Sequence, residues 1–117
     1  MKKTDIIIPI YNAFDFTKKC IETVIKHTDL TIHHLVLIND KSPDAKILPM
    51  LEAFVSTYPH LNIKLINNEE NLGFVKTVNT GMTYSEHDII LLNSDTEVTK
   101  GWLQKMQACA YSKPLIA

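Results

Sequence analysis

The sequence predicts an α/β protein in three layers, with a mainly parallel, doubly wound sheet between two layers of helices. Short apolar runs alternate along the chain with longer segments whose apolar residues recur at helical spacing. Three of the apolar runs also end abruptly in polar residues, which is typical of parallel strands that carry side chains to one edge of a sheet. Parallel strands need long crossovers, and the helical segments between the runs provide them.

The first strand is expected at Ile6–Ile8, where three isoleucines follow one another. An amphipathic helix should come next, because lysines and a glutamate lie opposite an apolar face. The residues of that face are Phe16, Cys20, Ile21, Val24 and Ile25. Asp29–Thr31 interrupts the helical pattern, and the second strand is expected at His33–Ile38.

The start of the second helix is harder to place. Ser42-Pro43-Asp44 has the composition of a helix start, with proline near the first turn. Pro49 inside the helix, however, would remove a hydrogen bond and clash with the preceding turn. We therefore expect the main helix to begin near Leu48 and to end at Tyr58-Pro59. Its inward-facing residues would be Leu51, Phe54 and Val55.

The remaining segments continue the alternation. A third strand is expected at Ile63–Ile66, and the polar loop Asn67–Gly73 separates it from a third helix. That helix is marked by Phe74, Val75, Val78 and Met82. The fourth strand is expected at Asp88–Leu92. A last helix is indicated by Trp102, Leu103, Met106, Cys109 and Ala110.

Length and charge limit the range of functions. The 117 residues form one domain, residues 1–117, without room for a second core. Twelve basic and thirteen acidic side chains form no block of either sign, so we expect no binding of nucleic acid through bulk charge. The apolar run near the N-terminus is too short for a signal peptide or a membrane span, so we expect a cytoplasmic chain without membrane insertion. Cys20 and Cys109 are expected to be buried free thiols on helix faces.

The exit of the fourth strand carries the strongest functional signal. Its apolar run leads directly into Asn93-Ser94-Asp95, and Glu97 follows two residues later. Ligands of open α/β sheets bind at the carboxyl ends of strands, and carboxylate oxygens suit a hard cation that also bridges to phosphate. The alternative is an ordinary acidic turn, because Asp, Asn, Ser and Thr are common turn residues.

The other strand exits favour a binding site over a simple turn. The second strand runs into Asn39-Asp40 and the first into Pro9–Asn12, so parallel order would bring these residues to one edge. Glycine-rich phosphate loops are excluded, because the sequence contains neither G-x-x-x-x-G-K-S/T nor G-x-G-x-x-G. A site that manages diphosphate charge through a metal and carboxylates therefore becomes the better candidate.

These motifs resemble the amino-terminal half of the family 2 glycosyltransferases, which have the A-type (GT-A) nucleotide-sugar-binding fold. The segments that carry the resemblance are Ile8–Asn12, Ile38–Asp44, Asn71–Gly73 with Asn79 and Gly81, and Leu92–Val98. Each segment is common alone, but their order and spacing together are specific. The matching region extends from Ile6 to about Trp102.

The resemblance implies that the strand exits bind a nucleotide. Pro9 and Tyr11 would lie against the nucleoside, and Asp40 would accept a hydrogen bond from the imide N–H of a uracil or thymine base. The expected nucleotide-binding residues are Pro9, Tyr11, Asn12, Asp40, Asn71, Gly73 and Ser94. Alternatives stay open, since Asp40 could form an Asx turn or cap a helix, and the loop at Asn71 could be a plain turn.

The resemblance also implies a divalent cation, Mg²⁺ or Mn²⁺. Asn93-Ser94-Asp95 would be this chain's version of the Asp-x-Asp signature, with Asp95 and Asn93 as metal ligands. The first acid of the pair after the second strand is likewise replaced, by Asn39. Each replacement keeps an oxygen acceptor but removes a charge, so Asp95 would carry the larger share of metal binding. Glu97 would either assist or remain an exposed acid.

The implied activity is transfer of a sugar from a nucleotide-diphosphate sugar, with a UDP-sugar favoured, to a hydroxyl of a saccharide or glycoconjugate acceptor. Members of the family usually invert the anomeric centre and use a carboxylate base downstream of Asp-x-Asp. We expect that base and the acceptor-binding part after Ala117, so the chain looks truncated at its C-terminus. It would then supply donor binding and be inactive alone, with no catalytic residue of its own.

The resemblance further implies a role in polysaccharide synthesis, in the cytoplasm or peripherally at the inner face of a membrane. An unpaired sheet edge would favour a homo-oligomer. The main alternative is a non-catalytic nucleotide-binding or interaction module on the same scaffold. A phosphoacceptor receiver domain is disfavoured because it would need acids where Pro9–Asn12 stands, and a nucleotidyltransferase would need a glycine-rich basic loop there.

Overall fold

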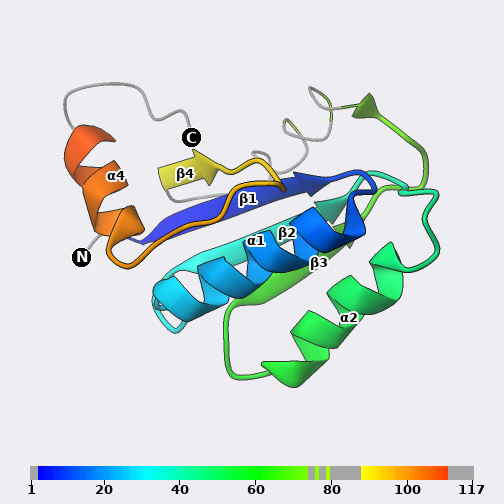
Figure 1. The fold of residues 1–117 in the computed structure, drawn as a ribbon. Helices are drawn as coiled ribbons and strands as arrows, with labels where there is room; N and C mark the ends of the chain where they lie inside the picture. The colour runs from blue at the N-terminus through cyan, green and yellow to red at the C-terminus, as the bar shows by residue number, and fades with distance from the viewer. Residues whose placement is uncertain (1–2, 74–75, 77–78, 80–87, 111–117) are drawn as a thin grey trace.

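The computed structural model describes residues 3–73, 76, 79 and 88–110 (Figure 1). Its elements are β1 (Thr4–Ile10), α1 (Phe14–His27), β2 (His34–Asn39), α2 (Ile47–Thr57), β3 (Ile63–Asn67), β4 (Asp88–Leu91) and α4 (Trp102–Ala110). This order confirms the predicted α/β alternation. The third expected helix, marked by Phe74, Val75, Val78 and Met82, lies outside the described residues.

The four strands form one parallel sheet in the order β3-β2-β1-β4. The chain moves outward from β1 to β2 and β3, and then returns to place β4 on the other side of β1. This reversal makes the β1/β4 junction the topological switch point, where ligands of open α/β sheets bind. The register pairs Ile10 with Asn39 and Ile7 with Leu91, so β1 and β2 end at the same level and β4 ends three residues earlier.

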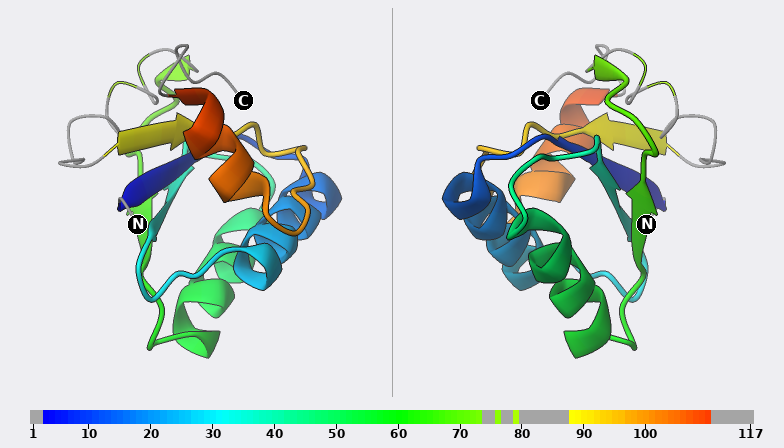
Figure 2. Two further views of the ribbon diagram at one scale, coloured as in Figure 1. Left: turned by 90° about the vertical axis from the view of Figure 1, so that its left-hand side faces the viewer. Right: turned by 90° about the vertical axis from the view of Figure 1, so that its right-hand side faces the viewer.

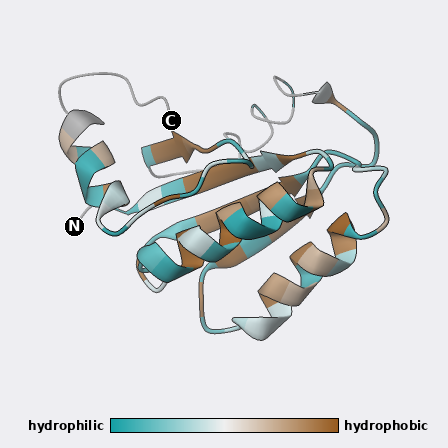
Figure 3. Ribbon diagram, in the orientation of Figure 1, coloured by the Kyte–Doolittle hydropathy of each residue, from teal (hydrophilic) through white to brown (hydrophobic). Residues whose placement is uncertain are grey.

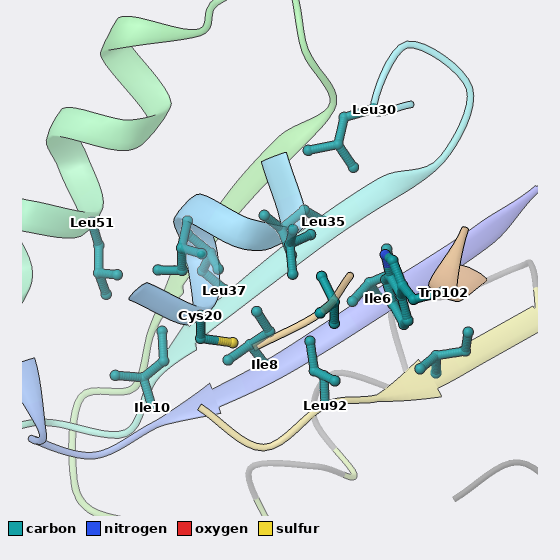
Figure 4. Close-up of a cluster of buried hydrophobic side chains, with 14 of the residues drawn as sticks. Ile6, Ile8, Ile10, Cys20, Leu30, Leu35, Leu37, Leu51, Leu92 and Trp102 are labelled. Atoms are coloured by element: carbon teal, nitrogen blue, oxygen red, sulfur yellow. The ribbon is translucent and has the colours of Figure 1, made fainter. Parts of the chain in front are cut away.

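The main core lies between one face of the sheet and the helices α1, α2 and α4 (Figures 2 and 4). Alternate strand residues point to this face, including Ile6, Ile8 and Ile10 of β1, as the twofold period of a strand requires. The strands are largely hydrophobic, whereas hydrophilic and hydrophobic residues alternate along α1 (Figure 3). The other face buries a smaller cluster around Ile7 and Ile38.

The first strand extends further than predicted, because Pro9 and Ile10 belong to β1 instead of following it. Proline lacks the N–H that a central strand normally donates. Here β4 pairs with β1 only as far as Ile7, whose carbonyl accepts the Leu92 N–H at 2.9 Å. Pro9 has the same orientation as Ile7 but lies beyond this pairing, so its missing N–H removes no bond of the β1–β4 ladder.

One core assignment on α1 is wrong. Phe16 is 65% exposed, although its spacing to Cys20 suits the apolar face. The buried stripe runs through Thr17, Cys20, Ile21 and Val24, and Phe16 lies at the margin of this stripe on the solvent side. Phe14 packs against the core instead, with the Lys46 ammonium 5.2 Å from its ring centre. A threonine thus takes a position that hydrophobicity alone would not assign to the core.

The second helix begins at Ile47, one residue before the predicted start. Pro49 is therefore its third residue and lies in the first turn, where the N–H would have no partner within the helix. Ser42-Pro43-Asp44 is not helical, contrary to the prediction. These residues are held instead by the loop that follows β1. The Ser42 hydroxyl accepts the Asn12 N–H, and the Asp44 N–H donates to the Asn12 side chain.

Replacing Leu37 with alanine should lower the free energy of unfolding by about 2–5 kcal/mol, because its side chain is fully buried in the main core. Equilibrium urea denaturation measures this change. The matched control is Phe16→Ala, which removes a larger but mostly exposed side chain and should change stability by less than about 0.5 kcal/mol. A larger loss for Phe16→Ala than for Leu37→Ala would contradict the described packing of the helices on the sheet.

Candidate functional site

The carboxyl ends of all four strands meet at one edge of the sheet because the strands are parallel. Along this edge, in spatial order, the exits carry Asn68 after β3, Asp40 after β2, Asn12 after β1 and Asn93 after β4. Residues that are far apart in the sequence are therefore neighbours here. The predicted gathering of polar strand exits is present in the fold.

Asn12 joins the exits of β1 and β2. Its backbone N–H donates to the Ser42 hydroxyl at 3.0 Å, and its side-chain Oδ1 accepts the Asp44 N–H at 3.0 Å. Its φ of 55° lies in the left-handed region, which asparagine tolerates better than most residues. Asn39 completes the arrangement by accepting the Ser42 N–H at 3.1 Å. Asn12, expected to touch a nucleotide, thus ties the loop after β1 to the loop after β2.

Asp40 holds a distant loop against the end of β2. Its carboxylate is only 4% exposed and accepts the backbone N–H groups of Leu72 at 2.8 Å and Gly73 at 2.9 Å. The Asn68 amide donates a third bond at 3.0 Å. Hydrogen bonds to an ionised acceptor are stronger than neutral ones. Asp40 therefore organises residues 68–73. Because Gly73 is helical, these bonds are closest to the helix-capping alternative and differ from an Asx turn.

The loop at Asn71 needs glycine for its backbone conformation. The Gly73 N–H also contacts the Asn71 side-chain oxygen at 3.0 Å, and its φ is +80°. A Cβ built on Gly73 would meet no atom within 4 Å, so lack of space is not the reason for glycine. The reason is the positive φ, which costs other L-residues roughly 1–2 kcal/mol.

The exit of β4 forms an exposed turn that carries Asp95. The Thr96 N–H donates to the Asn93 carbonyl at 3.0 Å and closes the turn. Asn93, Asp95 and Glu97 are exposed, whereas Ser94 is half-buried. The side-chain oxygens of Asn93 and Asp95 are of the type that Mg²⁺ and Mn²⁺ accept.

The structure limits how many protein ligands such a cation could have. Within residues 3–73 and 88–110, no three His, Cys, Asp or Glu side chains gather to hold a metal. A cation at Asp95 would therefore take most of its ligands from phosphate oxygens and water, with one carboxylate and one carboxamide from the chain. That pattern is common for Mg²⁺ in phosphate-handling sites.

Tyr11, directly after β1, is 49% exposed. An exposed aromatic ring offers a flat surface for stacking. Pro9, two residues earlier, is half-buried within the strand. A cavity of about 510 Å³ lies elsewhere, between the end of α1 and the start of α4. The case for this edge therefore comes from its chemistry and topology.

Sequence reasoning missed the residues that support this edge from beneath. The thiol of Cys20 in α1 donates a hydrogen bond to the Asn93 carbonyl at 3.6 Å, and the Thr23 hydroxyl accepts one from the Val98 N–H at 3.1 Å. Burial raises the pKa of the Cys20 thiol to about 12. Cys20 was correctly predicted to be a buried free thiol, whereas the side chain of Cys109 lies outside the described residues. No local pattern signals either contact, because the partners are 73 and 75 residues apart.

Residues 5–115 match the family model described as glycosyl transferase family 2. The uncharacterized glycosyltransferase YwdF of Bacillus subtilis (strain 168) is 30% identical over 105 residues, which cover 89% of this chain and 37% of YwdF. The chain thus spans little more than a third of that relative. Among the described residues, no helix has the length and apolar character needed to cross a bilayer.

Two solved structures share the fold. The crystal structure of S. aureus TarS 1–349 in complex with UDP-GlcNAc superposes with a TM-score of 0.75 at 24% identity, over 94% of this chain and 31% of that one. GalNAc-T7 with UDP, GalNAc and Mn²⁺ gives a TM-score of 0.79 at 20% identity, over 91% of this chain and 20% of that one. The sheet and its helices therefore have the architecture of these glycosyltransferases, as the predicted fold class requires.

Asp40→Asn should release the loop at residues 68–73. An amide keeps one oxygen, so one of the backbone N–H groups of Leu72 and Gly73 would face an NH₂ donor, at a cost of about 1–3 kcal/mol. Hydrogen exchange followed by NMR should show faster exchange of both amides. Asp44→Asn is the control, because asparagine keeps the single oxygen that accepts the Lys46 N–H. Unchanged protection of Leu72 and Gly73 would refute the anchoring role of Asp40.

The Cys20 thiol should resist alkylation in the folded chain. Its pKa is raised from 9.0 to about 12, so the reactive thiolate at pH 8 is about a thousandfold scarcer than for an ordinary cysteine. A Cys109→Ser variant leaves one thiol to be followed with iodoacetamide, before and after unfolding in guanidinium. Labelling should be slow until the chain unfolds, and should accelerate as the pH rises toward 12. Fast labelling at pH 8 of the folded chain would contradict its burial.

Proposed function

The chain belongs to glycosyl transferase family 2, and from this membership we propose that it forms the donor-binding part of an enzyme that transfers a sugar from a nucleotide-diphosphate sugar to an acceptor hydroxyl. One observation carries the proposal most directly. The exits of β1, β2 and β4 share one edge at the switch point, with an exposed aromatic ring on one side and an exposed carboxylate on the other.

We assign the nucleoside to the exits of β1 and β2. Tyr11 offers its exposed ring for stacking, beside Pro9. Asp40 would accept the imide N–H of the base, because a fixed carboxylate is a strong acceptor for that donor. Gly73 borders the same region through its bond to Asp40, and Asn71 borders it by accepting the Gly73 N–H. A uridine donor is favoured, and the solved complexes of TarS with UDP and with UDP-GlcNAc support this choice by analogy.

We assign the diphosphate to the turn after β4. Asp95 and Asn93 would hold a Mg²⁺ or Mn²⁺ ion, and Ser94 would face the phosphates. A bound cation neutralises the charge that develops on the departing nucleoside diphosphate. The carboxylate of Asp95 has no neighbouring acid among the described residues that would complete an all-protein site. The metal ion and the nucleotide should therefore bind together. The phosphate oxygens complete the ligands of the ion, and the ion neutralises the charge of the phosphates.

The chain spans 37% of YwdF, and we propose the remaining steps for a protein of that greater length. A general base must remove the proton of the acceptor hydroxyl, and we propose that it lies outside these 117 residues. The reaction would invert the anomeric centre, and the acceptor would be a saccharide or glycoconjugate. We further propose a cytoplasmic enzyme of polysaccharide synthesis that works at the inner membrane face and self-associates through a sheet edge.

A second candidate is a non-catalytic nucleotide-binding or interaction module on the same scaffold. The replacement of two expected acids by Asn39 and Asn93 favours it, because both changes lower the negative charge available to a metal. The side-chain oxygen of Asn39 also already accepts a hydrogen bond from the Ser42 N–H. The two candidates differ in one measurable property, because only the donor site should bind a nucleotide in a metal-dependent way.

Isothermal titration with UDP should give a Kd on the order of 0.1–1 mM, about 4–5.5 kcal/mol, only when Mn²⁺ is present. Asp95→Asn should abolish the metal dependence, since it removes the one charge that the turn directs to the cation. Glu97→Gln is the matched control, because it removes the same charge from an exposed acid two residues away. It should weaken binding by no more than about threefold.

Two results would contradict the donor-site assignment. The first is an equal loss of UDP affinity in Asp95→Asn and Glu97→Gln, which would mean that the metal effect depends on overall negative charge and not on Asp95 itself. A folded chain that binds neither UDP, TDP nor GDP in the presence of Mn²⁺ would favour the interaction module.

A further inference from the structure

Three residues of α1 contact the loops on both sides of the switch point. Thr17, Cys20 and Thr23 follow one another at intervals of three, so they form one row that runs obliquely across the helix. Thr17 reaches the loop after β1, whereas Cys20 and Thr23 reach the segment after β4. Figure 4 shows Cys20 projecting from α1 toward the sheet, beside Ile8.

The contact on the β1 side is made by Thr17. Its side chain is fully buried, and its hydroxyl donates to the Asn12 carbonyl at 3.3 Å. Asn12 is the residue whose remaining bonds fix Ser42 and Asp44. The helix therefore sets the position of the loop that leads from Tyr11 on the nucleoside side of the edge.

The contacts on the β4 side bracket the turn that carries Asp95. The thiol of Cys20 donates to the carbonyl of Asn93, at the start of the turn, at 3.6 Å. Thr23 accepts the N–H of Val98, beyond the end of the turn, at 3.1 Å. The Thr23 hydroxyl donates to the Cys20 carbonyl at 2.9 Å, which directs its oxygen lone pairs away from the helix.

These contacts matter because residues 92–99 have neither helical nor strand structure. The backbone ladder ends at Leu92, whose N–H donates to the Ile7 carbonyl, and the bond from Thr96 to Asn93 closes the turn. Side-chain bonds to α1 add the contacts that tie both ends of the turn to a rigid helix. A displacement of about 1 Å in a binding group is enough to lower function substantially.

We propose that Thr17, Cys20 and Thr23 form a positioning row on α1 that sets the spacing between the nucleoside loop at Asn12 and the metal-binding turn at Asp95. The inference rests on the proposed donor site for its functional consequence, and on the hydrogen bonds alone for its structural part. The row residues touch neither nucleotide nor metal. They act through the backbone of Asn12, Asn93 and Val98.

The test replaces Thr23 with valine, which keeps the shape but removes the oxygen that accepts the Val98 N–H. Mn²⁺ affinity in the presence of UDP, measured by electron paramagnetic resonance, should fall about fivefold, the effect of one neutral hydrogen bond. Thr23→Ser should restore affinity, because serine keeps the acceptor. Exchange of the Val98 amide in the metal-free chain should accelerate in Thr23→Val and recover in Thr23→Ser.

Thr28→Val provides the matched control at the residue that directly follows α1. Thr28 accepts the Trp102 indole N–H at 2.8 Å, so this variant also loses a hydrogen bond to the chain after β4, but beyond the turn. It should lower the Tm without changing Mn²⁺ affinity. Equal losses of affinity in Thr23→Val and Thr28→Val would overturn the proposal, because they would indicate general destabilisation.

The two proposals can fail separately. If the unaltered chain binds no Mn²⁺ with UDP, the donor site is refuted and the exchange of the Val98 amide decides the structural part of the row. If the unaltered chain binds Mn²⁺ and Thr23→Val binds it equally well, the positioning row is refuted while the donor site stands.

Discussion

Parallel pairing of β1 with a neighbour on each side is the constraint on which the rest of this structure depends. Because β2 and β4 run in the same direction as β1, every strand leaves the sheet at the same edge. The same pairing directs Ile6, Ile8 and Ile10 to one face, where the helices cover them. Packing and binding chemistry are thereby separated, with apolar side chains along the strands and polar groups at their ends.

Most of the fold could be predicted because it depends on local periodicity. Apolar runs and helical spacing located all seven described elements, with boundaries displaced by up to two residues. The errors arose where tertiary contacts override local preference. Phe16 has the correct spacing for burial, yet Phe14 packs against the core and Thr17 is buried for its hydrogen bond. Pro49 was hard to place because its cost depends on its position in the helix.

The residues of the site could be predicted from the sequence, but the hydrogen bonds that hold them could not. Strand exits can be recognised in the sequence, so Asp40 and Asp95 were identified as residues of one edge. The contacts that hold them could not be predicted, because no periodic pattern links Asp40 to Leu72 and Gly73. The same is true of the bond from Cys20 to the Asn93 carbonyl at the start of the Asp95 turn. Asp40 illustrates the difference, because a carboxylate expected to meet a ligand also organises the backbone of a neighbouring loop.

The position of β4 in the sheet also has a consequence for how the chain folds. Strands β1, β2 and β3 pair through crossovers that close short loops, whereas Thr4 pairs with Asp88 across most of the chain. Closing this larger loop costs more chain entropy. The three-stranded part should therefore form first and be the last to open, with β4 docking late. Transient undocking of β4 would separate the turn at Asp95 from an otherwise folded molecule, so the proposed metal side of the edge is the part most exposed to local unfolding.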